Sequence, residues 1–202
     1  MLDLVRPALT LLLLFTILTG AIYPLAVTGL AQAIAPRRAN GSLVARDGRV
    51  VGSELIGQPF TRPGYFWGRP SATSPQPHDA SASTGSNLGP SNPALRDAVA
   101  ARVAVLRAAD PQATGPVPVD LVTASASGLD PHVSLAAAHF QVGRVARARR
   151  LEPAVVRALV ERSAEGRTLG LLGEPRVNVL RLNLALDAQS PGWGGTEEPA
   201  GQ

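Results

Sequence analysis

The residue types of a serine hydrolase triad occur together in one short segment. Ser125, Ser127, Asp130, His132 and His139 lie within fifteen positions of one another. A catalytic serine sits on a strained turn and receives its base from elsewhere in the fold, and the G-x-S-x-G turn is absent here. Helix capping and loop hydrogen bonds explain these residues more simply. We expect no catalytic residues, and a secreted Ser hydrolase remains the alternative.

Metal and phosphate chemistry have little more support. His132 and His139 are seven positions apart, whereas helical metal ligands are usually four apart or joined by a carboxylate ligand. The chain has no cysteine and therefore no thiolate ligand. All 19 basic residues are arginine, which excludes a Walker A loop because that loop needs a lysine. We expect neither a bound metal nor a P-loop.

The positive charge is not arranged for nucleic acid. The net charge is only +4 and 4% of the residues are aromatic, whereas single-stranded nucleic acid is bound by interleaved basic and aromatic side chains. The arginines cluster once, at Arg144, Arg147, Arg149 and Arg150. This cluster can meet phosphate or lipid headgroups, but a solvated helix face is the simpler interpretation. We expect no nucleic-acid partner.

An uncharged apolar stretch near the N-terminus determines how the rest of the chain is placed. No charged residue lies between Arg6 and Arg37, and residues 7–35 exceed the roughly 20 apolar residues that a helix needs to cross a bilayer. We predict a transmembrane helix over 7–35 after a short segment, 1–6. Signal-peptide cleavage after Ala33 or Ala35 is the alternative, but the apolar run is about twice as long as a typical signal core.

Proline and small residues mark places in this helix where another helix can approach. Pro24 is expected to kink it. Thr16, Gly20 and Thr28 are small or hydroxyl-bearing and allow close backbone contact, although such residues are also common in membrane helices generally. More arginines follow the span than precede it, but long domains translocate largely regardless of charge. The charge pattern therefore leaves the orientation open.

Residues 36–190 are predicted to form one α+β domain. Asp47-Gly48 is a two-residue turn typical of a β-hairpin. A helix is predicted to begin at Pro93 with Asn92 as its N-cap, and another at Pro153. A third follows a cap at Ser134 or Asp130. The fold class is thus a single N-terminal transmembrane α-helix followed by one α+β soluble domain.

Other segments are less well defined by their pattern. Residues 116–123 are expected to be extended. Residues 177–187 fit a strand, by alternating leucines, or a helix capped by Asn178. By composition, residues 70–93 are a flexible linker, and residues 191–202 are a disordered tail.

Several motifs, in order along almost the whole chain, resemble the C subunit of the bacterial Kdp potassium-transporting P-type ATPase. They are Thr19-Gly-Ala-Ile-Tyr-Pro24, Gly52-Ser-Glu-Leu-Ile-Gly-Gln58, Tyr65-Phe-Trp-Gly-Arg-Pro-Ser-Ala72, Gly85-Ser-Asn-Leu88, Ser91-Asn-Pro93, residues 120–132, Arg144-Val-Ala-Arg-Ala-Arg149 and Val177-Asn-Val-Leu180. Thr84 stands where the family often has a second glycine. Motifs of this number and order are specific to the family.

The resemblance implies a non-catalytic, single-pass subunit of the bacterial inner membrane, with a short cytoplasmic N-terminus, residues 1–6, and its large domain, residues 36–190, outside the cytoplasm. The implied partners are the lipid bilayer, an ATP-hydrolysing subunit and a channel-like potassium-translocating subunit. The implied role is to support assembly and, as a catalytic chaperone, to raise the ATP affinity of the hydrolysing subunit. The chain itself is expected to bind no cofactor, ATP being possible only through the complex. A stand-alone membrane-tethered binding module is a further alternative.

Two sets of residues carry the functional expectations. Gln141 matches the glutamine of the family's nucleotide proposal, although cytoplasmic ATP would lie across the membrane from it, and a glutamine bonded to backbone groups is the simpler interpretation. Partner contacts are expected from the span and from the loops 68–71, 86–92 and 125–130. The candidates are Thr16, Gly20, Pro24, Thr28, Gly68, Arg69, Pro70, Ser71, Ser86, Asn87, Asn92, Ser125, Ser127 and Asp130.

Overall fold

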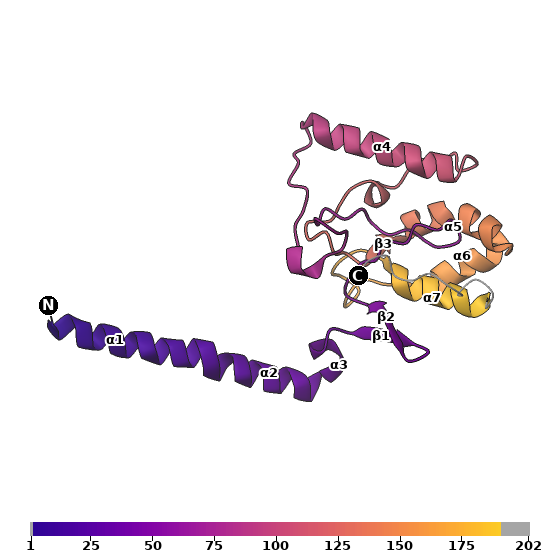
Figure 1. The fold of residues 1–202 in the computed structure, drawn as a ribbon. Coiled ribbons are helices and arrows are strands. Elements are labelled where there is room, and N and C mark those ends of the chain that lie inside the picture. The colour runs from indigo at the N-terminus through magenta and orange to yellow at the C-terminus, as the bar shows by residue number, and fades with distance from the viewer. Residues whose placement is uncertain (1, 191–202) are drawn as a thin grey trace. The chain divides into compact units, whose positions relative to one another are not determined.

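The computed structural model describes residues 2–190. The chain divides into two compact units, one up to Leu43 and one from Val44 onward, which correspond to an apolar helix and a mixed helix and sheet domain (Figure 1). The predicted fold class is therefore confirmed. The predicted disordered tail, 191–202, lies outside the described residues.

The first unit is helical along the whole apolar stretch. It comprises α1 (Leu2–Ile17), a π-helical turn (Leu18–Ile22), α2 (Tyr23–Ile34) and the short α3 (Pro36–Ala39). The segment Leu4–Ile34 has 31 residues, a mean hydropathy of 2.1 and no buried residue in its most apolar window. By length and composition it can cross a bilayer.

The π-helical turn lies where a proline kink is predicted. In a regular α-helix the ring of Pro24 would collide with the carbonyl four residues earlier. Here the N–H of Tyr23 donates to the carbonyl of Leu18, and this five-residue spacing widens the turn just before the proline. The helical path continues from α1 into α2 (Figure 1), so a widened turn accommodates Pro24.

The domain begins with the predicted hairpin. Strands β1 (Leu43–Arg46) and β2 (Arg49–Ser53) pair with each other. Asp47 and Gly48 between them have positive φ values of 52° and 76°, as a type I′ turn requires. The turn sequence alone was sufficient to locate this element.

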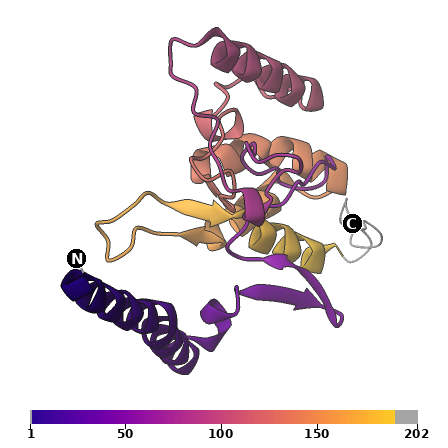
Figure 2. The same ribbon diagram turned by 60° about the vertical axis from the view of Figure 1, so that its left-hand side comes forward.

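A three-stranded antiparallel sheet and three helices form the body of the domain (Figure 2). The strand order is β3-β5-β4, with Val133 opposite Val177 and Ala164 opposite Val177 on its other side. The strands are β3 (His132–Ser134), β4 (Ala164–Glu165) and β5 (Arg176–Asn178), and the helices are α5 (Leu135–Arg149), α6 (Pro153–Arg162) and α7 (Val179–Gln189).

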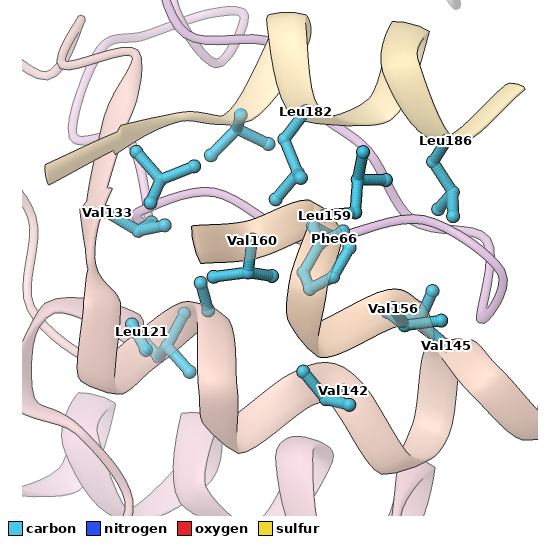
Figure 3. Packing of buried hydrophobic residues seen from close by; sticks show 14 of the residues in the cluster. Phe66, Leu121, Val133, Val142, Val145, Val156, Leu159, Val160, Leu182 and Leu186 are labelled. Atoms are coloured by element: carbon cyan, nitrogen blue, oxygen red, sulfur yellow. The ribbon is translucent and has the colours of Figure 1, made fainter. Parts of the chain in front are cut away.

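The core fills the space between these helices and the sheet. Figure 3 shows Phe66 among side chains from α5, α6 and α7, where it is fully buried. Its neighbours are mostly small branched residues, among them Val145, Val160 and Leu182, each 0% exposed. Because interiors are packed as tightly as organic crystals, this cluster fixes the spacing of α5 and α7.

Three helices begin at positions that the sequence indicates. Asn92 accepts from the N–H of Ala94 at 2.9 Å at the start of α4 (Pro93–Ala109). Ser134, not Asp130, caps α5 by accepting from the N–H of Ala137 at 3.1 Å. Pro153 is the first residue of α6. These caps satisfy otherwise unpaired N–H groups at the helix starts.

Two local expectations are corrected. Residues 119–121 form a 3-10 turn (Val119–Leu121) within the segment expected to be extended, because Leu121 is drawn into the core. Residues 177–187, which fit either a strand or a helix, form the end of a strand and then a helix. Strand β5 ends at Asn178, and the Asn178 side chain caps α7 by accepting from the N–H of Arg181 at 3.1 Å. A second 3-10 turn, Ala80–Ala82, lies in the predicted linker.

Candidate functional site

Residues 63–68, called the strap here, cross the core without forming a helix or strand. Two side-chain amides pair with the strap's backbone. Asn183 of α7 accepts from the N–H of Phe66 at 2.8 Å and donates to its carbonyl at 3.0 Å. Gln141 of α5 accepts from the N–H of Trp67 at 2.8 Å and donates to its carbonyl at 3.1 Å. The two amides thus reproduce the paired bonds of an antiparallel ladder.

Gln141 has no hydrogen-bonding capacity left for a ligand in this arrangement. Its amide nitrogen also donates to the carbonyl of Ala137 at 3.2 Å, and its amide oxygen also accepts from Arg144 at 2.6 Å. A carboxamide has two donor hydrogens and two acceptor lone pairs, so all four are engaged. The residue is 2% exposed. Its geometry is that of a strap-holding residue.

The predicted solvated arginine face is only half correct, because two of its four members are buried at 4% exposure each. Arg144 donates to the carbonyls of Pro63 and Tyr65 at 2.6 and 3.0 Å and stacks over the Trp67 ring. Burial lowers the pKa of Arg144 to about 10, although Asp110 acts in the opposite direction. The remaining two, Arg147 and Arg150, are exposed.

Arg149 connects the strap to the end of α7. Its Nε donates to the carbonyl of Gly64 at 2.6 Å, and its guanidinium pairs with Asp187 at 2.7 Å. Asp187 also accepts from Arg46 at 3.1 Å and from the hydroxyl of Tyr65 at 3.2 Å. Burial, and then the charge of Asp187, raise the pKa of Tyr65. One buried carboxylate therefore joins β1, the strap, α5 and α7.

Beyond the strap, the predicted loops 68–71 and 125–130 meet. Arg69 pairs with Asp130 at 3.0 Å and donates to the carbonyls of Thr123 and Ala124 at 3.4 and 3.3 Å. Asp130 also accepts from the N–H of His132 at 3.0 Å. Burial alone would raise the pKa of Asp130, but the hydrogen bonds from His132 and Arg69 outweigh it and lower the pKa to about 2.

Residues 70–93, predicted to be a flexible linker, are hydrogen-bonded to the same loop, 125–130. The hydroxyl of Ser71 donates to the carbonyl of Gly128 at 2.8 Å and accepts from the N–H of His78 at 2.9 Å. The N–H of Thr84 donates to the carbonyl of Ser127 at 3.1 Å. The composition suggested flexibility because serine and proline bury little apolar surface, but here polar contacts hold the segment.

The triad residue types are not assembled into a triad. The hydroxyls of Ser125 and Ser127 lie 3.3 Å apart, and that of Ser127 accepts from the N–H of Leu129. His132 lies beside Asp130, and His139 pairs with Glu161 at 2.9 Å. Within residues 2–190, no hydrogen bond links these serines to these histidines, and no three His, Cys, Asp or Glu side chains are grouped to hold a metal.

The third predicted loop contributes differently. Ser86 and Asn87 are exposed, and Asn92 is occupied as the cap of α4. Gly68, Arg69 and Pro70 line an open hollow of about 340 Å³, together with Gln58, Pro59, Phe60, Thr61, Trp67, His78 and Val105. Among the predicted loop residues, the exposed polar side chains are those of Ser86, Asn87, Asn92 and Ser127, and a partner can reach them and this hollow.

The predicted contact residues of the span are accessible in their own unit. Thr16, Gly20, Pro24 and Thr28 are all exposed. They recur every four residues, which places them near one side of a helix, and no described atom lies within 4 Å of a Cβ built on Gly20. A second helix can therefore approach the backbone there.

Sequence reasoning missed Asn183 and Asp187. Both are buried, at 1% and 5% exposure. A signal was present: Asn183 and Asp187 stand four positions apart among leucines, at the spacing of one helical face. A polar residue on a buried face needs a partner, but the sequence does not name the partner.

Comparison with known proteins identifies the family. The family model described as K+-transporting ATPase, c chain matches residues 5–188. The potassium-transporting ATPase KdpC subunit of Sorangium cellulosum is 69% identical over 182 residues, covering 90% of this chain and 96% of that protein. Those of Methylococcus capsulatus and Polaromonas naphthalenivorans are each 64% identical, covering 91% and 94% of this chain and 96% of each relative. The chain belongs to the KdpC family of K+-transporting ATPase subunits.

Proposed function

We propose that this chain is the non-catalytic accessory subunit of an ATP-driven potassium uptake complex. Its partners in the proposal are an ATP-hydrolysing subunit and a channel-like potassium-translocating subunit, and it supports their assembly. The observation that carries the proposal is the family match over residues 5–188. The unassembled serines and histidines argue in the same direction, away from a Ser hydrolase. Loss of an otherwise stable complex on removing residues 36–190 would support the assembly role.

We further propose that the chain acts as a catalytic chaperone without touching ATP. In this proposal it raises the ATP affinity of the hydrolysing subunit by stabilising a state of the complex that binds ATP more tightly, as linkage between two sites allows. The complete engagement of the Gln141 amide supports an indirect route. A nucleotide photoaffinity probe that labelled this chain near residue 141 would contradict it.

The large domain is proposed to lie outside the cytoplasm in a bacterial inner membrane, held by a single span. Arginine counts do not decide between the two orientations because long domains translocate largely regardless of charge. Reporter enzymes fused after residue 190 decide it: alkaline phosphatase activity is expected from this fusion, and a cytoplasm-dependent fluorescent protein fused there is expected to stay dark. The reverse pattern would refute the orientation.

The contact surface is proposed to include Ser86, Asn87 and Ser127, together called the rim here. The three side chains of the rim are exposed. In the two loops that meet, Arg69 pairs with Asp130 and donates to the carbonyls of Thr123 and Ala124. Pre-organised loops lose less entropy on binding. Ser86→Trp should weaken co-purification of the complex, whereas Ala158→Trp, on the exposed side of α6, should not. Equal yields from both variants would remove the rim from the interface.

A further inference from the structure

The loop that connects β4 to β5 carries an exposed group of leucines. It extends away from the body of the domain (Figure 2). Residues 167–174, called the leucine tip here, carry Leu169, Leu171 and Leu172, which are 87%, 80% and 64% exposed. Single exposed leucines are ordinary, but contiguous exposed apolar residues mark contact surfaces.

Part of the backbone of the leucine tip is hydrogen-bonded within the tip. The N–H of Thr168 donates to the carbonyl of Leu172 at 2.8 Å, and the N–H of Gly170 donates to the carbonyl of Arg167 at 3.1 Å. The N–H groups of Leu171 and Leu172 both donate to the carbonyl of Thr168, at 3.2 and 3.0 Å. Polar groups that are already paired cost less to remove from water. The N–H groups of residues 168 and 170–172 therefore need no partner from the surroundings.

The charged residues of the leucine tip lie at its two ends, on either side of the leucines. Residues 168–173 carry no charge. At the two ends of this segment, the guanidinium of Arg167 contacts both oxygens of the Glu174 carboxylate at 2.8 Å. Leu169 has a positive φ of 56°, a strained conformation for a residue with a Cβ. The exposed leucines are therefore flanked by an ion pair that carries no net charge.

The leucine tip fits a lipid surface better than a protein surface. Three leucine side chains expose on the order of a few hundred Å², well below the ~800 Å² per partner of a stable protein interface. Lipid insertion needs no such threshold, since each buried apolar group adds its own contribution. Moreover, the domain begins at Val44 and α2 ends at Ile34, so the connecting residues 35–43 reach about 30 Å at most. The start of the domain therefore stays close to the bilayer, which raises the effective concentration of lipid around the domain.

We propose that the leucine tip inserts Leu169, Leu171 and Leu172 into the headgroup and acyl boundary of the bilayer that holds the span. Arg167 and Glu174 then remain at headgroup level, as charged side chains do at a membrane interface. The contact would act as a second attachment and restrict the swing of the domain about its linker. It concerns the membrane alone and does not depend on the proposed effect on ATP.

The absence of cysteine makes the test direct. Leu171→Cys is introduced into the full chain, labelled with a nitroxide and placed in phospholipid discs containing phosphatidylcholine and phosphatidylglycerol. Val119→Cys, 69% exposed on a 3-10 turn, is the matched control. Collision rates with O₂, which partitions into lipid, and with a water-soluble nickel chelate are measured by electron paramagnetic resonance. We expect O₂ to dominate at position 171 and the chelate at 119.

Two results would overturn the proposal. Chelate access at position 171 equal to that at 119, with Leu172→Cys giving the same answer, would place the tip in water. Shielding that appears only after the ATP-hydrolysing and channel-like subunits are added would make the tip a protein contact instead. Unchanged circular dichroism in each labelled variant excludes misfolding as the cause. A failed assembly test under the proposed function would leave these measurements unaffected.

Discussion

Replacing Gln141 with leucine separates a structural role from a nucleotide role. Leucine is close in size but cannot hydrogen-bond, so Gln141→Leu leaves the N–H and carbonyl of Trp67 and one N–H of Arg144 without their partner. An unsatisfied buried group costs about 1–3 kcal/mol. We expect a loss of about 3–5 kcal/mol in the free energy of unfolding, which is roughly 6–20 °C in Tm for a domain of this size.

Asn183→Leu is the matched control. Asn183 makes the same two bonds to Phe66 that Gln141 makes to Trp67, but no nucleotide proposal involves it. Its loss should cost about 2–4 kcal/mol. Gln141→Glu should fall between wild type and Gln141→Leu, because a carboxylate still accepts from Trp67 and Arg144 but cannot donate to the Trp67 carbonyl.

Two assays decide the outcome. Thermal unfolding of the full chain in detergent measures the stability loss, and the ATP dependence of potassium-stimulated hydrolysis is measured on the assembled complex at a temperature where all variants are folded. We expect the two leucine variants to behave alike in both assays. A wild-type Tm for Gln141→Leu, together with a raised KM for ATP that Asn183→Leu does not share, would refute the structural role.

Three further predictions follow from the contacts of charged and glycine residues. Asp187→Ala should destabilise the domain by about 3–5 kcal/mol, because it removes the carboxylate that forms the ion pair with the buried Arg149 guanidinium. Chemical denaturation measures this, and a loss below about 1 kcal/mol would contradict it. The fold lowers the pKa of Asp130 to about 2, so the contribution of its carboxylate to stability is present above its ordinary pKa and is lost as pH falls through 4 toward 2. Asp130→Asn should therefore flatten the curve of unfolding free energy against pH over that window. A curve parallel to that of wild type would refute the lowered pKa. Gly128→Ala should lower Tm by several degrees, because a Cβ there would lie 2.7 Å from the Thr84 carbonyl oxygen and the backbone has a positive φ of 69°. Gly89→Ala is the control, since a Cβ at Gly89 would meet nothing within 4 Å among the described residues.

The sequence by itself determined the features that depend on neighbouring residues. The apolar stretch, the Asp47-Gly48 hairpin and the helix cap at Asn92 were located correctly, and Ser134 was one of the two caps that the sequence offered for the next helix. In each case the physical cause spans only a few positions: a run of apolar side chains, two residues that tolerate positive φ, or a side chain that reaches an N–H two or three residues ahead.

The tertiary structure alone decided which polar residues are structural. Gln141 and Asn183 pair with backbone groups that are 74 and 117 positions away in the chain, and no local pattern encodes such a distance. For the same reason the linker composition of residues 70–93 concealed an ordered segment, since its hydrogen bonds go to the loop at 125–130. Buried amides and carboxylates acquire their roles from partners that only the folded chain brings within hydrogen-bond distance.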